Sequence, residues 1–166
     1  MTDALTAEGL HLRPMEPADM PAVAELWYAG WHDGHDGLVP DALARQRTLA
    51  SFRDRLGKRM PTTRLAVVGP KIRGFSMISA SELHQFYVAA EARGTGTARL
   101  LMEDAETRIR AAGHAVAHLH CAIGNQRARH FYEKSGWHLA RTEPVDLETA
   151  EGGFTLNTWR FEKPLR

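Results

Sequence analysis

The chain has 166 residues, of which 43% are hydrophobic, and this is enough to build one compact domain around a buried core. Its 21 Lys and Arg residues nearly balance its 20 Asp and Glu residues, so the net charge of +1 gives no broad field that would attract nucleic acid or an anionic membrane. Cys121 is the single cysteine, which excludes an intramolecular disulfide and a metal site held by several cysteines. We therefore expect one domain, residues 1–166, with no nucleic-acid or membrane partner.

The N-terminal stretch, residues 1–12, has no basic segment followed by an apolar core. No uninterrupted apolar run in the chain approaches the ~18 residues of a membrane span. Together with the single cysteine, these features predict a soluble protein of the cytoplasm.

The first part of the chain predicts one strand and two helices. An apolar–polar alternation over 10–13 predicts a strand that ends at Pro14, and Asp19 is placed to cap a helix. Apolar residues spaced by three and four continue this helix to Trp31, after which Gly34 interrupts the pattern. Pro40 can open a second helix. The apolar stripe of that second helix is formed by Leu49, Phe52 and Leu56.

From residue 64 onward the pattern predicts six strands and two helices. Three β-rich runs separated by turns form a meander: Leu65–Val68, Ile72–Ile78 and Glu82–Val88. A strongly periodic helix then ends at Gly113. The elements after it are a strand over Ala115–Cys121, a helix over Asn125–Ser135, and strands over Trp137–Arg141 and Phe154–Phe161. This order predicts an α/β (α+β) domain with a mixed sheet.

The segment Arg93-Gly94-Thr95-Gly96-Thr97-Ala98 lies between a predicted strand and a predicted helix. Such a turn leaves backbone N–H groups unpaired at the positive end of a helix dipole, where they can hold a phosphate. Gly94 and Gly96 permit close approach of the backbone, and Arg93 adds a positive charge. A dinucleotide motif would need a third glycine where Arg99 stands, and a nucleotide P-loop would need Gly-Lys-Ser/Thr. The segment therefore predicts a pyrophosphate site, with a plain tight turn as the alternative.

Two motifs in this sequence resemble the signatures of the GNAT family of N-acetyltransferases. Arg93-x-x-Gly96-x-Ala98 resembles its coenzyme A pyrophosphate loop, Gln/Arg-x-x-Gly-x-Gly/Ala. The segment 124–137, Gly-Asn-Gln-Arg-Ala-Arg-His-Phe-Tyr-Glu-Lys-Ser-Gly-Trp, is similar to the second signature of Asn, Ala and Phe-Tyr-Glu-Lys-x-Gly-Phe. The order of elements also matches, although 27–60 matches only as two helices.

The resemblance implies a mostly antiparallel sheet of about six to seven strands with helices on both faces. Its two central parallel strands, 82–88 and 115–121, would splay apart to admit acetyl-CoA as the co-substrate. Carried over by position, the residues that would bind this co-substrate are Phe86, Tyr87, Val88, Arg93, Gly94, Thr95, Gly96, Thr97, Ala98, Asn125, Ala128 and Tyr132.

Transfer of an acetyl group to an amine needs a base, because an alkyl amine has a pKa near ~10 and must lose a proton. Glu82 lies early on its strand, where GNAT enzymes often carry a glutamate base. Side chains alternate along a strand, so we expect His84, Phe86 and Val88 to share the face of Glu82. Glu82, acting through water, is the expected general base, with His84 as its alternate; an edge carboxylate and a packed histidine are the structural alternative.

The helix that begins at Asn125 brings this residue and Tyr132 to nearly the same face. Asn125 can serve as a helix N-cap or contact the pantetheine amides. The resemblance places Tyr132 near the thioester sulfur, where its hydroxyl could protonate the departing thiolate. A core position beside Phe131 is the alternative for Tyr132.

Several aromatic and histidine side chains gather near the first predicted helix. They could line a pocket for the acceptor or pack in the core, and they are Trp27, Tyr28, Trp31 and His32. The stretch from His32 to Asp36 contains metal-ligand types but is expected to form a polar loop, and His118 and His120 share a strand face without an obvious third ligand. We expect no metal site.

The leading hypothesis is an acetyl-CoA-dependent N-acetyltransferase that acts on a primary amine of a small molecule or peptide through direct attack in a ternary complex. A non-catalytic acyl-CoA-binding or regulatory domain is the alternative. A toxin-type transferase that acts on aminoacylated RNA would need a basic surface, which the net charge of +1 does not favour. The chain could act as a homodimer.

Overall fold

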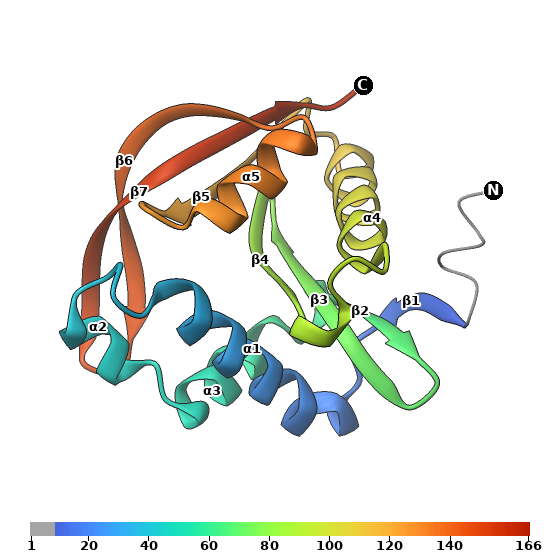
Figure 1. Ribbon diagram of the computed structural model, residues 1–166, viewed down its shortest axis with the longest axis horizontal. Coiled ribbons are helices and arrows are strands. Elements are labelled where there is room, and N and C mark those ends of the chain that lie inside the picture. Colours follow the sequence, from blue (N-terminus) through green and yellow to red (C-terminus); the bar gives the residue numbers. More distant parts are fainter. Residues whose placement is uncertain (1–8) are drawn as a thin grey trace.

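The structure is a computed structural model that describes residues 9–166 (Figure 1). Residues 1–8, where the sequence predicts no leader, lie outside the described residues. The helices are α1 Met20–His35, α2 Asp41–Gln46, α3 Leu49–Arg59, α4 Thr97–Ala111 and α5 Gln126–Lys134. The strands are β1 Leu10–Pro14, β2 Thr63–Val68, β3 Lys71–Ser79, β4 Glu82–Val88, β5 Val116–Ala122, β6 His138–Thr149 and β7 Gly152–Pro164.

The strands form one seven-stranded sheet in the order β1-β2-β3-β4-β5-β7-β6. Every neighbouring pair is antiparallel except β4 with β5, which is parallel. This confirms the predicted mixed, mostly antiparallel sheet. None of the helices in the described part of the chain is both long and apolar enough to cross a membrane.

The sheet separates two hydrophobic cores, so helices cover both of its faces as predicted (Figure 1). On one face, α1, α2 and α3 pack against β2 and β3, with Trp27, Phe52 and Phe75 completely buried. On the other face, α4 and α5 pack against β5 and β7, with Ile109 and Phe161 at the centre. Burial of apolar side chains on both faces holds the central strands in place between the helices.

The parallel strands β4 and β5 are paired at a single register position, Glu82 with His118. Next to it, the His118 N–H donates to the carbonyl of Ser81 at 3.0 Å. Beyond this point the two strands share no ladder, so each presents backbone and side chains to the space between them. The expected splay of the parallel pair is therefore present in the backbone.

The segment between β1 and β2 differs from its prediction. Helix α1 runs past Gly30 and Gly34 to His35, where a polar loop was expected, and the predicted second helix is divided into α2 and α3. Gly30 lies inside α1, and this position requires a glycine because a Cβ there would lie 2.6 Å from the Tyr87 ring. The division occurs at Thr48, whose hydroxyl oxygen accepts the Ser51 N–H at 3.1 Å and starts α3.

Asp19 precedes α1 as predicted, but its side chain does not cap that helix. Its carboxylate accepts the Glu16 N–H at 2.8 Å and pairs with both terminal nitrogens of Arg13 at 2.7 and 2.9 Å. The bidentate pair ties β1 to the start of α1.

The C-terminal hairpin is longer than the sequence pattern predicted. β6 and β7 pair along their length from His138 to Pro164 and form the long arched ribbon that reaches α2 in Figure 1. Pro144 lies within β6, at the edge of the sheet, where a residue without an N–H is tolerated. The far part of the hairpin packs Leu147 and Leu156 against the α1–α3 core.

Candidate active site

The turn before α4 has the backbone conformation that its glycines allow. Gly94 and Gly96 have φ angles of 77° and 87°, a region that residues with a side chain rarely adopt. Thr95 and Thr97 hydrogen-bond to each other through their hydroxyls at 2.8 Å, so both side chains stay within the turn. Helix α4 begins directly after Gly96, and its first N–H groups have no helical partner. The turn is therefore suited to bind an anion.

Two arginines beside this turn share one carboxylate of α1. Arg93 and Arg127 donate to the same oxygen of Asp33 at 3.1 and 3.0 Å. All three side chains are exposed, so these ion pairs contribute little to stability. Their effect is positional, because they bring two cationic groups to the mouth of the cavity described below.

The start of α5 is held by Asn125. Its side-chain oxygen accepts the Ala128 N–H at 3.3 Å, so the N-cap role is present. Its amide nitrogen lies against α1, where a Cβ on Gly34 would come within 3.0 Å. A contact between Asn125 and pantetheine stays a prediction.

Tyr132 lies on α5 in an aromatic environment. Its ring packs near those of Phe131, Trp137 and Phe161, with centroids 5.7 to 6.4 Å away. Burial raises the pKa of the Tyr132 phenol well above its ordinary value. The hydroxyl therefore keeps its proton near neutral pH, as a proton donor must.

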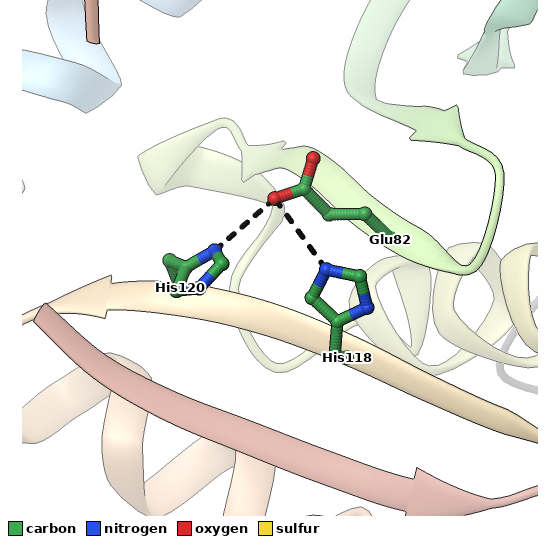
Figure 2. A group of neighbouring side chains, drawn as sticks. All are labelled: Glu82, His118 and His120. Carbon is green, nitrogen blue, oxygen red and sulfur yellow. Dashed lines mark hydrogen bonds and ion pairs between the residues drawn. The ribbon is translucent and has the colours of Figure 1, made fainter. Parts of the chain in front are cut away.

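Glu82, on β4, is surrounded by histidines (Figure 2). Its carboxylate is 2.9 Å from His84 Nδ1 and 3.2 Å from His120 Nδ1, and His118 Nε2 lies 4.0 Å away. His118 and His120 are alternate residues of β5, so both rings point to the same face of the sheet, toward Glu82 (Figure 2). We call these four residues the Glu82 cluster.

The charges in the Glu82 cluster follow from these contacts. Burial alone would raise the pKa of Glu82, but hydrogen bonds from His120 and His84 outweigh it and hold the pKa well below its usual range. Burial, together with the nearby positive charge of Arg160, lowers the pKa of His118. At neutral pH, Glu82 is therefore ionised and His118 is neutral.

A cavity of about 810 Å³ joins the turn, Tyr132 and the Glu82 cluster. It passes between the splayed strands β4 and β5 and extends under the far part of the β6–β7 hairpin, where Leu147 and Leu156 line it. Of the residues expected to contact the co-substrate or catalyse the reaction, the ones that line it are Glu82, His84, Phe86, Tyr87, Val88, Arg93, Gly94, Gly96, Ala98, Asn125, Ala128 and Tyr132.

The sequence of residues 41–137 matches the family model of the acetyltransferase (GNAT) family. The chain belongs to the GNAT family. Similar solved structures include a GCN5-related N-acetyltransferase from Rhodopseudomonas palustris, with 20% identity, 94% of this chain and 96% of that chain covered, and a TM-score of 0.74. No sequence match was found among curated proteins.

Two further similar solved structures contain coenzyme A or acetyl-CoA. PaiA N-acetyltransferase from Thermoplasma acidophilum, in complex with coenzyme A, shares 16% identity over 93% of this chain and 98% of its own, with a TM-score of 0.69. YncA from Salmonella typhimurium, with acetyl-CoA, shares 14% identity over 95% of this chain and 94% of its own, with a TM-score of 0.65. At these identities the likeness shows the fold.

One part of the β4 prediction is wrong. His84 is an extra residue in the ladder, since Met77 pairs with Gln85 while Ile78 pairs with Leu83. This bulge breaks the alternation, so Phe86 packs in the α4–α5 core and stacks on Phe131 at 5.6 Å, on the face opposite to Glu82. His84 still reaches Glu82, as expected from their shared face.

The residues expected to bind the acceptor are divided by the structure. Trp31 lines the cavity, whereas Trp27 is completely buried in the core and faces neither cavity. Tyr28 and His32 line a separate shallow hollow of about 550 Å³. His32 is engaged there by Asp36 at 2.8 Å and the Arg47 carbonyl at 2.7 Å.

The sequence did not indicate that Glu82 lies next to the pair His118 and His120. Within residues 9–166, the one group whose ligand-type atoms come close enough to hold a metal ion is Glu82, His118 and His120, within 4.8 Å of one another. A carboxylate and two imidazoles are donors that Zn²⁺ accepts, yet hydrogen bonds within the cluster also account for them. The His32–Asp36 stretch forms no such group, because Asp33 binds two arginines and His35 Nδ1 bonds to the Trp31 carbonyl.

Proposed function

We propose that this GNAT protein transfers the acetyl group of acetyl-CoA to a primary amine of a small molecule or peptide, by direct attack in a ternary complex. The observation that carries the proposal is a single cavity that contains a turn suited to bind an anion, an ionised carboxylate, Glu82, and a protonated phenol, Tyr132. These are the binding site, the base and the acid that such a transfer requires.

The turn and the start of α4 would hold the pyrophosphate of acetyl-CoA. Gly94 and Gly96 let the backbone approach it, the free N–H groups of α4 donate to it, and Arg93 and Arg127 lie close enough to add charge. The pantetheine arm would then pass between β4 and β5, where the absence of a ladder leaves backbone groups free to bind its amides.

The Glu82 cluster would take the proton of the attacking amine. As the new carbon–nitrogen bond forms, Glu82 accepts this proton directly or through water and later releases it to solvent, while His84 and His120 stay hydrogen-bonded to its carboxylate. The carbon–sulfur bond breaks, and the Tyr132 hydroxyl gives its proton to the sulfur. The amide and free coenzyme A are the products, and solvent returns a proton to the tyrosine.

Binding of acetyl-CoA and turnover of amines test the proposal separately. Acetyl-CoA at one hundred times its Kd should stabilise the protein by about 2.7 kcal/mol, while NAD and ATP at the same concentration should not. Release of coenzyme A thiol across a panel of amines then measures turnover. A thermal shift without turnover of any amine would favour a non-catalytic acyl-CoA-binding domain, and no shift at all would contradict both functions.

A matched variant connects turnover to the Glu82 cluster. Glu82→Gln keeps the size of the side chain and removes the base, so kcat should fall by about 10²–10⁴-fold while acetyl-CoA still stabilises the protein. Turnover by Glu82→Gln at the parental rate would assign the proton transfer to another group.

A further inference from the structure

Two arginines form part of the cavity wall at some distance in the chain from the anion-binding turn. Arg47 lies between α2 and α3, and Arg55 lies on α3. Arg47 is only 2% exposed, although charged side chains are rarely buried unless an opposite charge pairs with them. Both arginines line the part of the cavity on the sheet face covered by α1, α2 and α3.

Neither guanidinium has a carboxylate partner within residues 9–166. Arg47 donates through Nη1 to the carbonyl of Glu148 at 2.6 Å, and its buried Nε has no partner. The carboxylate of Glu148 pairs instead with Lys58 at 2.8 Å. Arg55 lies over the ring of Trp27 at 4.4 Å, and its buried Nη1 is also without a partner.

Buried donors and charges without partners are costly, so a folded protein rarely keeps two of them side by side in a cavity without a use. Burial lowers the pKa of both guanidinium groups, and burial together with the positive charge of Arg47 lowers that of Arg55 to about 10. Both groups still carry a positive charge at neutral pH. Tyr87, the neighbouring acidic group in the cavity, has a pKa raised by burial and supplies no negative charge.

The geometry favours a ligand oxygen pair. Nη1 of Arg47 is held by the Glu148 carbonyl, and the neighbouring Nε has no partner in the protein. The edge of the guanidinium that contains Nε can donate two parallel hydrogen bonds, which match the two oxygens of a carboxylate. The cavity wall also includes the apolar side chains of Leu43, Leu147 and Leu156, and one carboxylate from the hairpin, that of Asp146. The pyrophosphate of the co-substrate has its own cations, Arg93 and Arg127, at the other end.

We propose that Arg47 and Arg55 bind a carboxylate of the acceptor, so that the substrate is an amine that also carries a carboxylate, such as an amino acid. This inference rests on the proposed acetyltransferase function and narrows its substrate class. The amine of the bound molecule would then face the Glu82 cluster, which lines the same cavity.

Matched pairs of amines test the proposal. Alanine against alaninamide, 4-aminobutyrate against butylamine, and lysine against lysinamide differ mainly in the carboxylate. We expect kcat/KM for the best carboxylate to exceed that of its neutral partner by about 10- to 100-fold, as for hydrogen bonds to a charged group. Equal rates for both members of every pair would contradict the proposal, as would a preference for a phosphate-bearing amine such as phosphoethanolamine.

Substitutions of Arg47 and Arg55 test whether these two residues cause the preference for a carboxylate. Arg47→Met and Arg55→Met should each lower kcat/KM for the carboxylate substrate by about 10-fold or more and change the neutral partner little. Arg53→Met removes an exposed arginine from the same helix and should change neither, which makes it the matched control. A proportional loss for both members of a pair would assign the two arginines a structural role instead.

A binding measurement without acetyl-CoA separates this proposal from the general function. Trp27 contacts Arg55, so propionate or succinate bound at Arg55 should change tryptophan fluorescence, with chloride at equal ionic strength as the control. The change should be lost in Arg55→Met and kept in Arg53→Met.

Acetylation of amines without any carboxylate preference would refute the carboxylate site alone, whereas a carboxylate signal with no turnover would refute the proposed function alone. A signal that chloride reproduces would show general anion binding and contradict the carboxylate assignment.

Discussion

The two ends of the cavity are built in different ways. At the end near α4, the groups proposed to bind acetyl-CoA are mainly backbone N–H groups of one continuous segment, and their geometry depends on two glycines with positive φ. At the other end, the groups are side chains, Glu82 with its histidines and Arg47 with Arg55, from segments distant in the chain. The first end is fixed by local sequence, and the second depends on how the sheet and helices pack.

The largest expected effect tests the backbone end. Gly96→Val should weaken binding of acetyl-CoA by about 100-fold or more, because a branched side chain disfavours the required φ and blocks close approach to the pyrophosphate. Calorimetry on the folded variant measures the loss. Gly113→Val is the matched control, since Gly113 also has a positive φ of 99° but lies at the far end of α4. If both variants bind acetyl-CoA equally well, the turn is not its site.

The next largest expected effect concerns Tyr132, the proposed acid. Tyr132→Phe keeps the aromatic packing and removes the hydroxyl, so kcat should fall by roughly 10–10³-fold while affinity for acetyl-CoA changes little. The expected loss is partial because a thiol pKa near ~8.5 already makes the thiolate a fair leaving group. Parental turnover by the variant, with chemistry shown to limit the rate, would leave Tyr132 a packing role.

A smaller effect concerns the pH dependence of the protein's stability, to which His35 in the cavity wall contributes. His35 stacks on Trp31 with ring centroids 4.4 Å apart, and burial lowers its pKa from 6.5 to about 4. Below pH 6.5 the unfolded chain therefore binds a proton that the folded protein does not. The free energy of unfolding should fall as the pH falls from 6.5 toward 4, by up to about 3 kcal/mol in total.

Thermal unfolding between pH 6.5 and 5 measures this contribution together with that of His118, whose pKa is also lowered, while Glu82 has its own effect only below the ordinary carboxylate range. His35→Gln should flatten the dependence of the melting temperature on pH in that interval. The exposed His138 offers the matched control, and His138→Gln should keep the original slope. An unchanged slope in His35→Gln would mean that another group controls the pH response.

The smallest effect tests whether the side-chain end uses covalent chemistry. Burial raises the pKa of the Cys121 thiol to about 12, so the thiolate nucleophile is scarce at neutral pH. Cys121→Ser should keep its turnover, and so should the parent protein in EDTA. An acetyl group trapped on Cys121 during turnover would replace direct attack with a covalent mechanism.

The same contrast explains what the sequence could predict. The turn from Arg93 to Ala98 and the helix after Asn125 were predicted because their chemistry lies in contiguous motifs. The prediction for Glu82 included His84 but not His118 and His120, because these two residues reach Glu82 only through the register of two parallel strands. Periodicity could not predict this register.

Other differences also depended on long-range packing. Gly30 fits inside α1 because Tyr87 leaves no room for a Cβ there, and Pro144 fits inside β6 because that strand lies at the edge of the sheet. No local pattern in the sequence singles out Arg47 or Arg55, because their place in the cavity wall depends on how α2, α3 and the hairpin pack together. The fold class, which rests on the order of elements, was predicted correctly.

The bulge at His84 has a consequence for engineering the protein. A bulge is an insertion of one residue that the ladder absorbs locally, so the pairings of Leu83 and Gln85 with β3 are already those of a regular strand without His84. Deleting that residue should therefore keep Glu82 on the acceptor face and Phe86 on the opposite face, while removing one imidazole. The acceptor side of β4 can thus be shortened or lengthened by single residues without redesign of the side that faces Phe131.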